Sequence, residues 1–161
     1  MDNFWYSVIV DYIKTAQDVS KKAAAITGNQ WWMVINLGSE TRLMKTIKEH
    51  DYKQYILCSK QNPMNEWALK IYKKFNFPAK FNKRKDNVDI NVYGNLVIEV
   101  FYSDEILSEI EKCFHAKSIE DLDPFTTSNL AHKKTDITIK IFDDAAFAES
   151  IRAKVLKEFT S

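Results

Sequence analysis

The N-terminal segment of the chain has an amphipathic pattern. From Phe4 to Ala23, apolar residues recur every three or four positions, a spacing that places them on one face of a helix. Gly28 and Asn29 follow and would end such a helix. The pattern therefore predicts a long N-terminal helix within residues 1–27, with these inward-facing positions: Phe4, Trp5, Val8, Ile9, Tyr12, Ile13, Ala16, Val19 and Ala23.

The next segments predict alternating strands and helices. Trp31–Ile35 is a short apolar run without alternation, as in a strand buried on both faces, and 55–58 is a second such run. Ser39 is expected to cap the helix between them, while Asn62 and Pro63 provide a polar cap and a first-turn proline for the helix that follows. Strands that alternate with helices in this way indicate βαβ units and a parallel sheet.

The second half of the chain has a different pattern. Residues 88–92 alternate polar and apolar side chains, and 96–102 return after Tyr93-Gly94-Asn95, which predicts an antiparallel hairpin. Ser103 is expected to cap a helix that ends near His115. A polar connection over 121–134, a strand containing Ile137, Ile139 and Ile141, and a helix that starts after Asp143 or Asp144 complete the chain.

These elements predict one α/β domain over residues 1–161. Its mixed sheet joins a parallel N-terminal βαβ part to an antiparallel hairpin, with helices on the flanks. Residues 1–27 form the N-terminal helix and 28–161 the sheet domain. At 161 residues the chain is too short for two domains of ordinary size.

Composition and charge exclude several classes of protein. The formal net charge of +1 argues against nonspecific nucleic-acid binding of the strongly basic kind. Two cysteines, Cys58 and Cys113, cannot form a disulfide framework or a four-ligand zinc site. The longest uncharged stretch, residues 23–39, has 17 residues, several of them polar, and so falls short of the roughly twenty apolar residues of a membrane span; the N-terminus lacks a basic signal region. We therefore expect a cytoplasmic protein without a metal or another cofactor.

One segment comes close to a catalytic motif. "HAKSIEDLDPFTTSN", which starts at His115, resembles a phospholipase D-type phosphodiesterase motif. That motif needs its His and Lys on one face of a strand and an Asp seven residues after the His, where this chain has Leu122. The periodicity places His115 and Lys117 at a helix end, where their directions diverge by about 200°. A structural role at the helix end is the favoured interpretation, and no catalytic residue is assigned.

Three other segments are candidate binding sites. Asn36, Gly38 and Ser39 lie between a predicted strand and a helix, where free N–H groups can bind an anion or a hydroxyl group. The densest basic segment offers a second anion site, at Lys80, Lys83, Arg84 and Lys85, although a solvated loop explains it equally well. The segment 132–134 presents the same alternatives with fewer charges. Cys58 and Ser59 end a predicted strand, but no nucleophile elbow surrounds them.

Two stretches resemble a known family. "VDINVYGNLVIEVF" from Val88 and "TDITIKIFDDAAFAESIRAKVLKEF" from Thr135 are similar to the C-terminal region of TrmB-type transcriptional regulators. In particular, residues 148–152 match a helix start of the form Ala-Glu-Ser-x-Arg. The resemblance implies a phospholipase D-like fold that lacks the catalytic motif and acts as an effector-binding domain. The polar insertion at 118–134 departs from the family pattern, so no effector contacts are carried over.

The resemblance also implies partners. Regulators of this family carry a winged helix and a long helix before the sensor domain, and this chain has no room for the winged helix. Its first helix would then be the dimerisation element of a homodimer, through Phe4, Trp5, Val8 and Tyr12. The expected function is a non-catalytic sensor of a small-molecule effector, working with a separate DNA-binding partner protein. The alternatives are an anion, phosphate or nucleic-acid binding module and a phosphodiesterase or nuclease.

Overall fold

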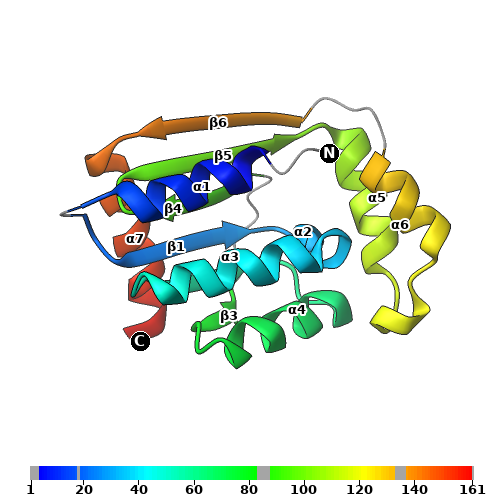
Figure 1. Cartoon of the computed structure of the whole chain (residues 1–161). Coiled ribbons are helices and arrows are strands. Elements are labelled where there is room, and N and C mark those ends of the chain that lie inside the picture. Colours follow the sequence, from blue (N-terminus) through cyan, green and yellow to red (C-terminus); the bar gives the residue numbers. More distant parts are fainter. Residues whose placement is uncertain (1–3, 18, 83–87, 133–136, 161) are drawn as a thin grey trace.

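A six-stranded mixed sheet forms the centre of the computed structural model, which describes residues 4–17, 19–82, 88–132 and 137–160 (Figure 1). The strand order is β3-β2-β1-β4-β5-β6. Strands β1 to β3 are mutually parallel, and the later strands are antiparallel to their neighbours. The α/β fold with a parallel part and an antiparallel hairpin is therefore confirmed. The strands are β1 (Lys22–Thr27), β2 (Lys53–Cys58), β3 (Ala79–Phe81), β4 (Val88–Tyr93), β5 (Leu96–Tyr102) and β6 (Ile137–Asp143).

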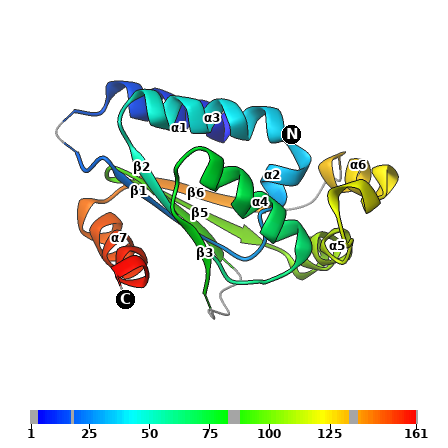
Figure 2. The ribbon, with the colours of Figure 1, turned by 90° about the horizontal axis from the view of Figure 1, so that it is seen from below.

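Helices cover both faces and one end of the sheet. In Figure 2, α1 and α3 lie on one face together with α4, α7 lies on the opposite face, and α5 and α6 stand at the end of the sheet. The helices are α1 (Phe4–Thr15), α2 (Trp31–Ile35), α3 (Leu37–Glu49), α4 (Pro63–Lys74), α5 (Asp104–Phe114), the 3₁₀ helix η1 (Ile119–Asp121), α6 (Pro124–His132) and α7 (Ala145–Thr160).

The N-terminal helix is shorter than predicted. It ends at Thr15, and the residues assigned to its second half include β1, the strand between β2 and β4. The prediction of a helix within 1–27 was therefore wrong beyond Thr15, and the sheet begins before residue 28. The reason is the run Ala23-Ala24-Ala25: alanine favours a helix locally, but here burial on both faces of the sheet overrides that preference.

The predicted first strand, Trp31–Ile35, is the short helix α2. An apolar run of this length cannot be told from a buried helical segment by periodicity alone. Trp31 and Met33 are buried in two different clusters, as a helical turn allows. The cap of the next helix also differs, because the side chain of Asn36 rather than Ser39 accepts the hydrogen bond, from the Ser39 N–H.

Most elements after residue 50 agree with the sequence pattern. β2, the Asn62 cap of α4, the β4–β5 hairpin and the Ser103 cap of α5 are all confirmed. Asp144 caps α7 through a hydrogen bond from the Phe147 N–H. The polar connection over 121–134 was predicted without a helix, but it contains α6, whose first turn is capped by Asp123.

Candidate functional site

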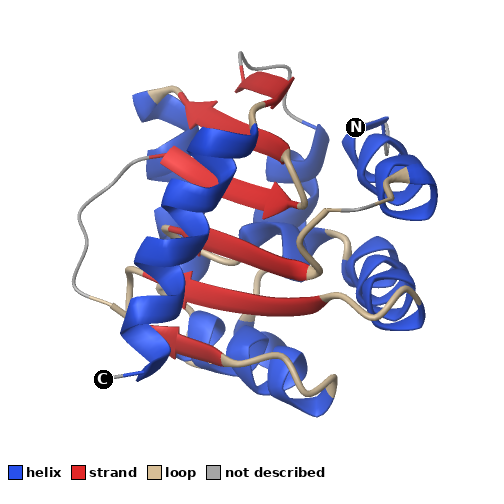
Figure 3. Cartoon of the chain, turned by 90° about the vertical axis from the view of Figure 1, so that its left-hand side faces the viewer, coloured by secondary structure: helices blue, strands red, loops and turns tan. Residues whose placement is uncertain are grey.

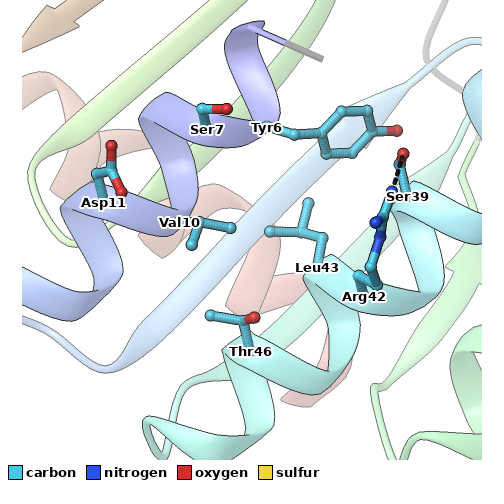
Figure 4. A pocket seen from close by; sticks show the side chains of 8 residues that line it. All are labelled: Tyr6, Ser7, Val10, Asp11, Ser39, Arg42, Leu43 and Thr46. Atoms are coloured by element: carbon cyan, nitrogen blue, oxygen red, sulfur yellow. Dashed lines mark hydrogen bonds between the residues drawn. The ribbon is translucent and has the colours of Figure 1, made fainter.

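A groove of about 460 Å³ lies between α1 and α3 on the surface of the protein (Figure 4). Its volume falls within the range of small-molecule sites, about 300–1,000 Å³. The two helices are in contact with each other, and Ile9 of α1 and Leu43 of α3 belong to the same buried cluster. The residues that line the groove are Tyr6, Ser7, Val10 and Asp11 from α1, and Ser39, Arg42, Leu43 and Thr46 from α3.

The groove has an apolar floor and polar ends. Val10 and Leu43 point toward each other in the middle, as Figure 4 shows. At one end, the exposed Arg42 donates a hydrogen bond from Nη2 to the Ser39 Oγ, over 3.2 Å. Asp11 lies on α1, farther along the groove. An apolar floor beside a guanidinium fork suits a small amphipathic molecule that carries an anionic group.

A buried carboxyl group lies directly beneath the groove. The Tyr6 hydroxyl donates a hydrogen bond to Oε1 of Glu40, which is only 5% exposed. On the other side of Glu40, the Tyr72 hydroxyl lies 3.4 Å from Oε2 and 3.2 Å from the Gln30 Oε1. Burial raises the pKa of Glu40, although the tyrosine hydrogen bonds oppose this rise. Glu40, on α3, thus connects α1 with α4, and the Tyr72 hydroxyl extends the connection to the loop that follows β1.

A small internal cavity of about 30 Å³ continues from Glu40 toward the sheet. It has room for about one water molecule. Leu43 lines both this cavity and the groove, so its side chain lies between the two spaces. The polar side chains on the cavity wall are Thr27, Gln30, Glu40, Gln54, Tyr72, Asp89, Asn91 and Tyr93.

Asp89, on β4, lies at the far end of this polar region, beside the carboxyl end of β1. Its Oδ1 accepts a hydrogen bond from the Gly28 N–H at 2.8 Å, and its Oδ2 accepts one from the Tyr102 hydroxyl at 2.5 Å. The indole N–H groups of Trp31 and Trp32 lie 3.1 and 3.2 Å from the same Tyr102 oxygen. Burial raises the pKa of Asp89 to about 6, while the hydrogen bonds from Tyr102 and Gly28 oppose the rise.

Helix α5 closes this end of the sheet. Leu107 and Ile110 line a narrow space of about 20 Å³ beside Asp89. The Lys60 ammonium group, from the loop after β2, forms a salt bridge with Glu111 on α5. The groove between α1 and α3 is therefore the more open of these two spaces.

Of the three residues predicted to bind a ligand, only Ser39 lines the groove. Asn36 caps α3 and Gly38 is exposed at its start. Asn36 and Gly38 do not follow a strand, because residues 31–35, predicted as a strand, form the helix α2. The loop that follows the actual first strand is Gly28–Gln30, which reaches the polar cavity and is fixed by a 2.7 Å hydrogen bond from the Gln30 N–H to Asn65.

The predicted basic site is only partly described. Lys80 lies on β3, with its ammonium group 5.1 Å from the centre of the Phe159 ring. Lys83, Arg84 and Lys85 lie outside the described residues, as do positions 133 and 134 of the weaker basic segment.

The predicted dimerisation residues all lie on α1. Val8 and Tyr12 are partly buried against the core of their own chain, and the Tyr12 hydroxyl accepts a hydrogen bond from the Asn95 N–H at 2.9 Å. Phe4 is 67% exposed, and the side chain of Trp5 lies outside the description. Only part of this set is therefore available to a partner.

The residues of the segment that resembles a phospholipase D motif lie at a helix end, as the sequence predicted. His115 is the C-cap of α5, and Lys117 follows it in an exposed bend. Cys58 is a buried core residue, and burial raises the pKa of its thiol to about 12. Within the described residues, no three His, Cys, Asp or Glu side chains come together as a metal site.

The sequence reasoning missed Glu40, Arg42 and Asp89. Glu40 and Arg42 look like ordinary helix-surface residues, since the tyrosines that pair with Glu40 come from segments 34 and 32 positions away. Asp89 could have been recognised as a candidate from the sequence, because it is an acidic residue between two apolar residues of a predicted strand.

Comparison with known proteins adds no further constraint. Within the described part of the chain, no helix has the length and apolar character that crossing a membrane requires. The chain matches no family model, no curated protein and no solved structure.

Proposed function

We propose that this protein is a non-catalytic regulatory domain that senses a small amphipathic anion in the groove between α1 and α3. The observation that carries the proposal is the composition of the groove walls. One wall is the N-terminal helix and the other belongs to the sheet domain, so a ligand that contacts both walls stabilises the docked position of α1.

The hydrogen bond between Tyr6 and Glu40 supports a regulatory role. It joins the groove wall to a carboxyl group that is buried and has a raised pKa. Buried polar groups of this kind destabilise a core unless they are fully hydrogen-bonded. A ligand that moves Tyr6 would therefore alter the contact of α1 with α3 and α4, which meet at Glu40.

The resemblance to TrmB-type regulators fits the same proposal. In that family a phospholipase D-like domain without catalytic residues binds an effector, and we propose the same fold type and role here. The signal would pass to a separate DNA-binding partner protein. His115 and Lys117, at the end of α5, offer no comparable support for a phosphodiesterase.

Titration with two simple probes tests the proposal. Hexanoate supplies a carboxylate with an apolar tail, and phenyl phosphate supplies a phosphate with an aromatic ring. We expect at least one probe to shift the NMR signals of α1 and α3 and to slow amide exchange in residues 4–15. Arg42→Ala should weaken this binding at least about tenfold, because a charge-assisted hydrogen bond contributes about 1.5–3 kcal/mol.

Lys45→Ala is the matched control, since Lys45 is exposed on the same helix but does not line the groove. It should leave the affinity unchanged. If neither probe perturbs the groove, or if both variants weaken binding equally, the groove is not the anion site.

A further inference from the structure

Strand β6 forms one edge of the sheet and has an open side. It is the last strand in the sheet order, and among the described residues it pairs only with β5. It is seven residues long, whereas β3 at the opposite edge has three. Figure 3 shows the strands stacked from top to bottom, with the C-terminal helix crossing in front of the sheet and the N-terminal helix at the right, and the strand at the top lies beyond both helices.

The edge of β6 has little protection against pairing. Natural edge strands are commonly guarded by lysine, proline, a bulge or short length. β6 contains a single lysine, Lys140, whose ammonium group lies 4.7 Å from the centre of the Phe101 ring on the neighbouring strand β5. The charge therefore leans back over the sheet, and the backbone N–H and C=O groups of the outer edge stay accessible.

The side-chain pattern of β6 is self-complementary. Side chains alternate between the two faces of a strand, so Ile137, Ile139 and Ile141 share one face, while Thr138 and Lys140 share the other. In an antiparallel pair related by a two-fold axis through Ile139, each Ile137 lies opposite the Ile141 of the second copy. Thr138 then lies opposite Lys140, and no like charges meet.

The neighbouring registers of the same symmetry are less favourable. An axis through Lys140 places this residue opposite its own copy, and like charges at directly opposed positions destabilise a strand pair. An axis through Ile141 places Asp143 opposite Ile139, a charged residue against an apolar one. A register shifted by one residue would place the isoleucines of one copy opposite Thr138 and Lys140 of the other. The two isoleucine faces would then lie on opposite sides of the joined sheet.

We propose that a second copy of this chain docks on β6, antiparallel and with the two-fold axis at Ile139, so that the two sheets join into one. Ile139 is 38% exposed in the single chain and would be buried at the centre of this interface. A strand pair covers less than the roughly 800 Å² per partner of a standard stable interface. The dimer is therefore expected to dissociate on dilution. This inference does not depend on the function proposed for the groove.

Sedimentation of the full chain over a concentration series tests the proposal. The wild type should pass from monomer to dimer as concentration rises. Ile139→Lys should remain monomeric at every concentration, because two lysines would then meet at the axis. Phe4→Lys, which changes the exposed aromatic residue of α1, should dimerise like the wild type. A wild type that stays monomeric throughout, or a dimer lost in Phe4→Lys but kept in Ile139→Lys, would overturn the proposal.

Cysteine crosslinking tests the register without a destabilising charge. At the axis, Ile139→Cys faces its own copy at a Cβ separation of about 5 Å, close to disulfide range. Mild oxidation should then produce a covalent dimer. Thr138→Cys faces Lys140 instead and should crosslink far less. The native cysteines are buried and should not interfere. Equal crosslinking at 138 and 139, or none at 139, would contradict the two-fold arrangement.

Discussion

The two faces of the sheet are built in different ways. Helix α7 covers one face through an apolar cluster that contains no tyrosine or acid among its buried members: Ala24, Ile26, Leu57, Val92, Val97, Ala148, Ile151 and Val155. The face under α1, α3 and α4 has a larger apolar cluster, but it also encloses Glu40, Gln30 and Gln54. Tyr6, Tyr72 and Tyr93 supply hydroxyl groups to these polar residues.

This difference separates stability from function. An apolar contact layer such as the α7 face contributes mainly burial of surface, at about 25 cal/mol per Å². A buried polar network contributes little net stability. Removing one of its members is nevertheless destabilising, because the remaining groups are left buried without a hydrogen-bond partner. The α7 face therefore contributes mainly to stability. The opposite face combines a larger apolar cluster with buried polar groups, and we propose that these groups respond to a ligand or to pH.

The largest effect is expected on the α7 face. Ile151→Ala removes a buried side chain from the apolar cluster and should lower the free energy of unfolding by about 2–5 kcal/mol, without changing probe binding in the groove. Urea denaturation followed by circular dichroism measures this change. Lys154→Ala, on the exposed side of the same helix, is the control and should change stability little. A loss below 1 kcal/mol for Ile151→Ala would show that α7 is not the stabilising layer.

The next effect depends on pH. Burial raises the pKa of Asp89 from 3.8 to about 6, so the folded protein keeps a proton that the unfolded chain releases in this range. Wild-type stability therefore falls as pH rises from about 4 to about 6, by at most about 3 kcal/mol from this group. Asp89→Asn cannot ionise, so its stability relative to the wild type should increase through this window and stay constant above it.

Denaturation of both proteins at several pH values gives that difference directly, and Glu40 cancels because both proteins contain it. The variant loses an acceptor for the Tyr102 hydroxyl, which adds an offset independent of pH in this range. A stability difference that does not change between pH 4 and 6 would mean that Asp89 is ionised at both ends of the window.

A smaller effect is expected at the contact between α1 and Glu40. Tyr6→Phe keeps the ring but removes the donor to Glu40, and should cost about 1–2 kcal/mol and speed amide exchange in α1. Tyr12→Phe is a matched control on the same helix, since it removes the acceptor for the Asn95 N–H. Both variants should loosen α1, but only Tyr6→Phe should alter probe affinity in the groove.

The smallest change in stability is expected at Arg42. This residue is exposed, and its hydrogen bond to Ser39 lies within the same helix. Arg42→Ala should change the free energy of unfolding by no more than about 0.5 kcal/mol. A large loss of stability in thermal or urea unfolding would assign Arg42 a structural role and weaken its assignment as the anion contact.

The sequence predicted the elements whose signals are local. The strands β4, β5 and β6 and the caps at Asn62, Ser103 and Asp144 were predicted from neighbouring residues, and all are confirmed. The region around β1 and α2 could not be predicted in the same way. There the alanine run and the apolar run 31–35 take the structures that burial requires, against their local preference.

The candidate site was harder to predict than the fold. Ser39 was found because it lies near a helix start, yet Glu40 and Arg42, beside it on the same helix, carry no local signal. Their roles depend on α1, whose Tyr6 is 34 positions before Glu40. Pairings over such distances follow from tertiary packing, which a single sequence does not reveal.

The three consecutive alanines of β1 limit which amino-acid substitutions this strand can accept. They lie in an inner strand, and their methyl groups point alternately toward α7 and toward the opposite helical layer. Because alanine ends at Cβ, both layers approach the backbone of this strand closely. A single added carbon at Ala24 or Ala25 would push against a whole helix, so variation in side-chain size is far more restricted along this strand than at the solvent-facing rim of the molecule.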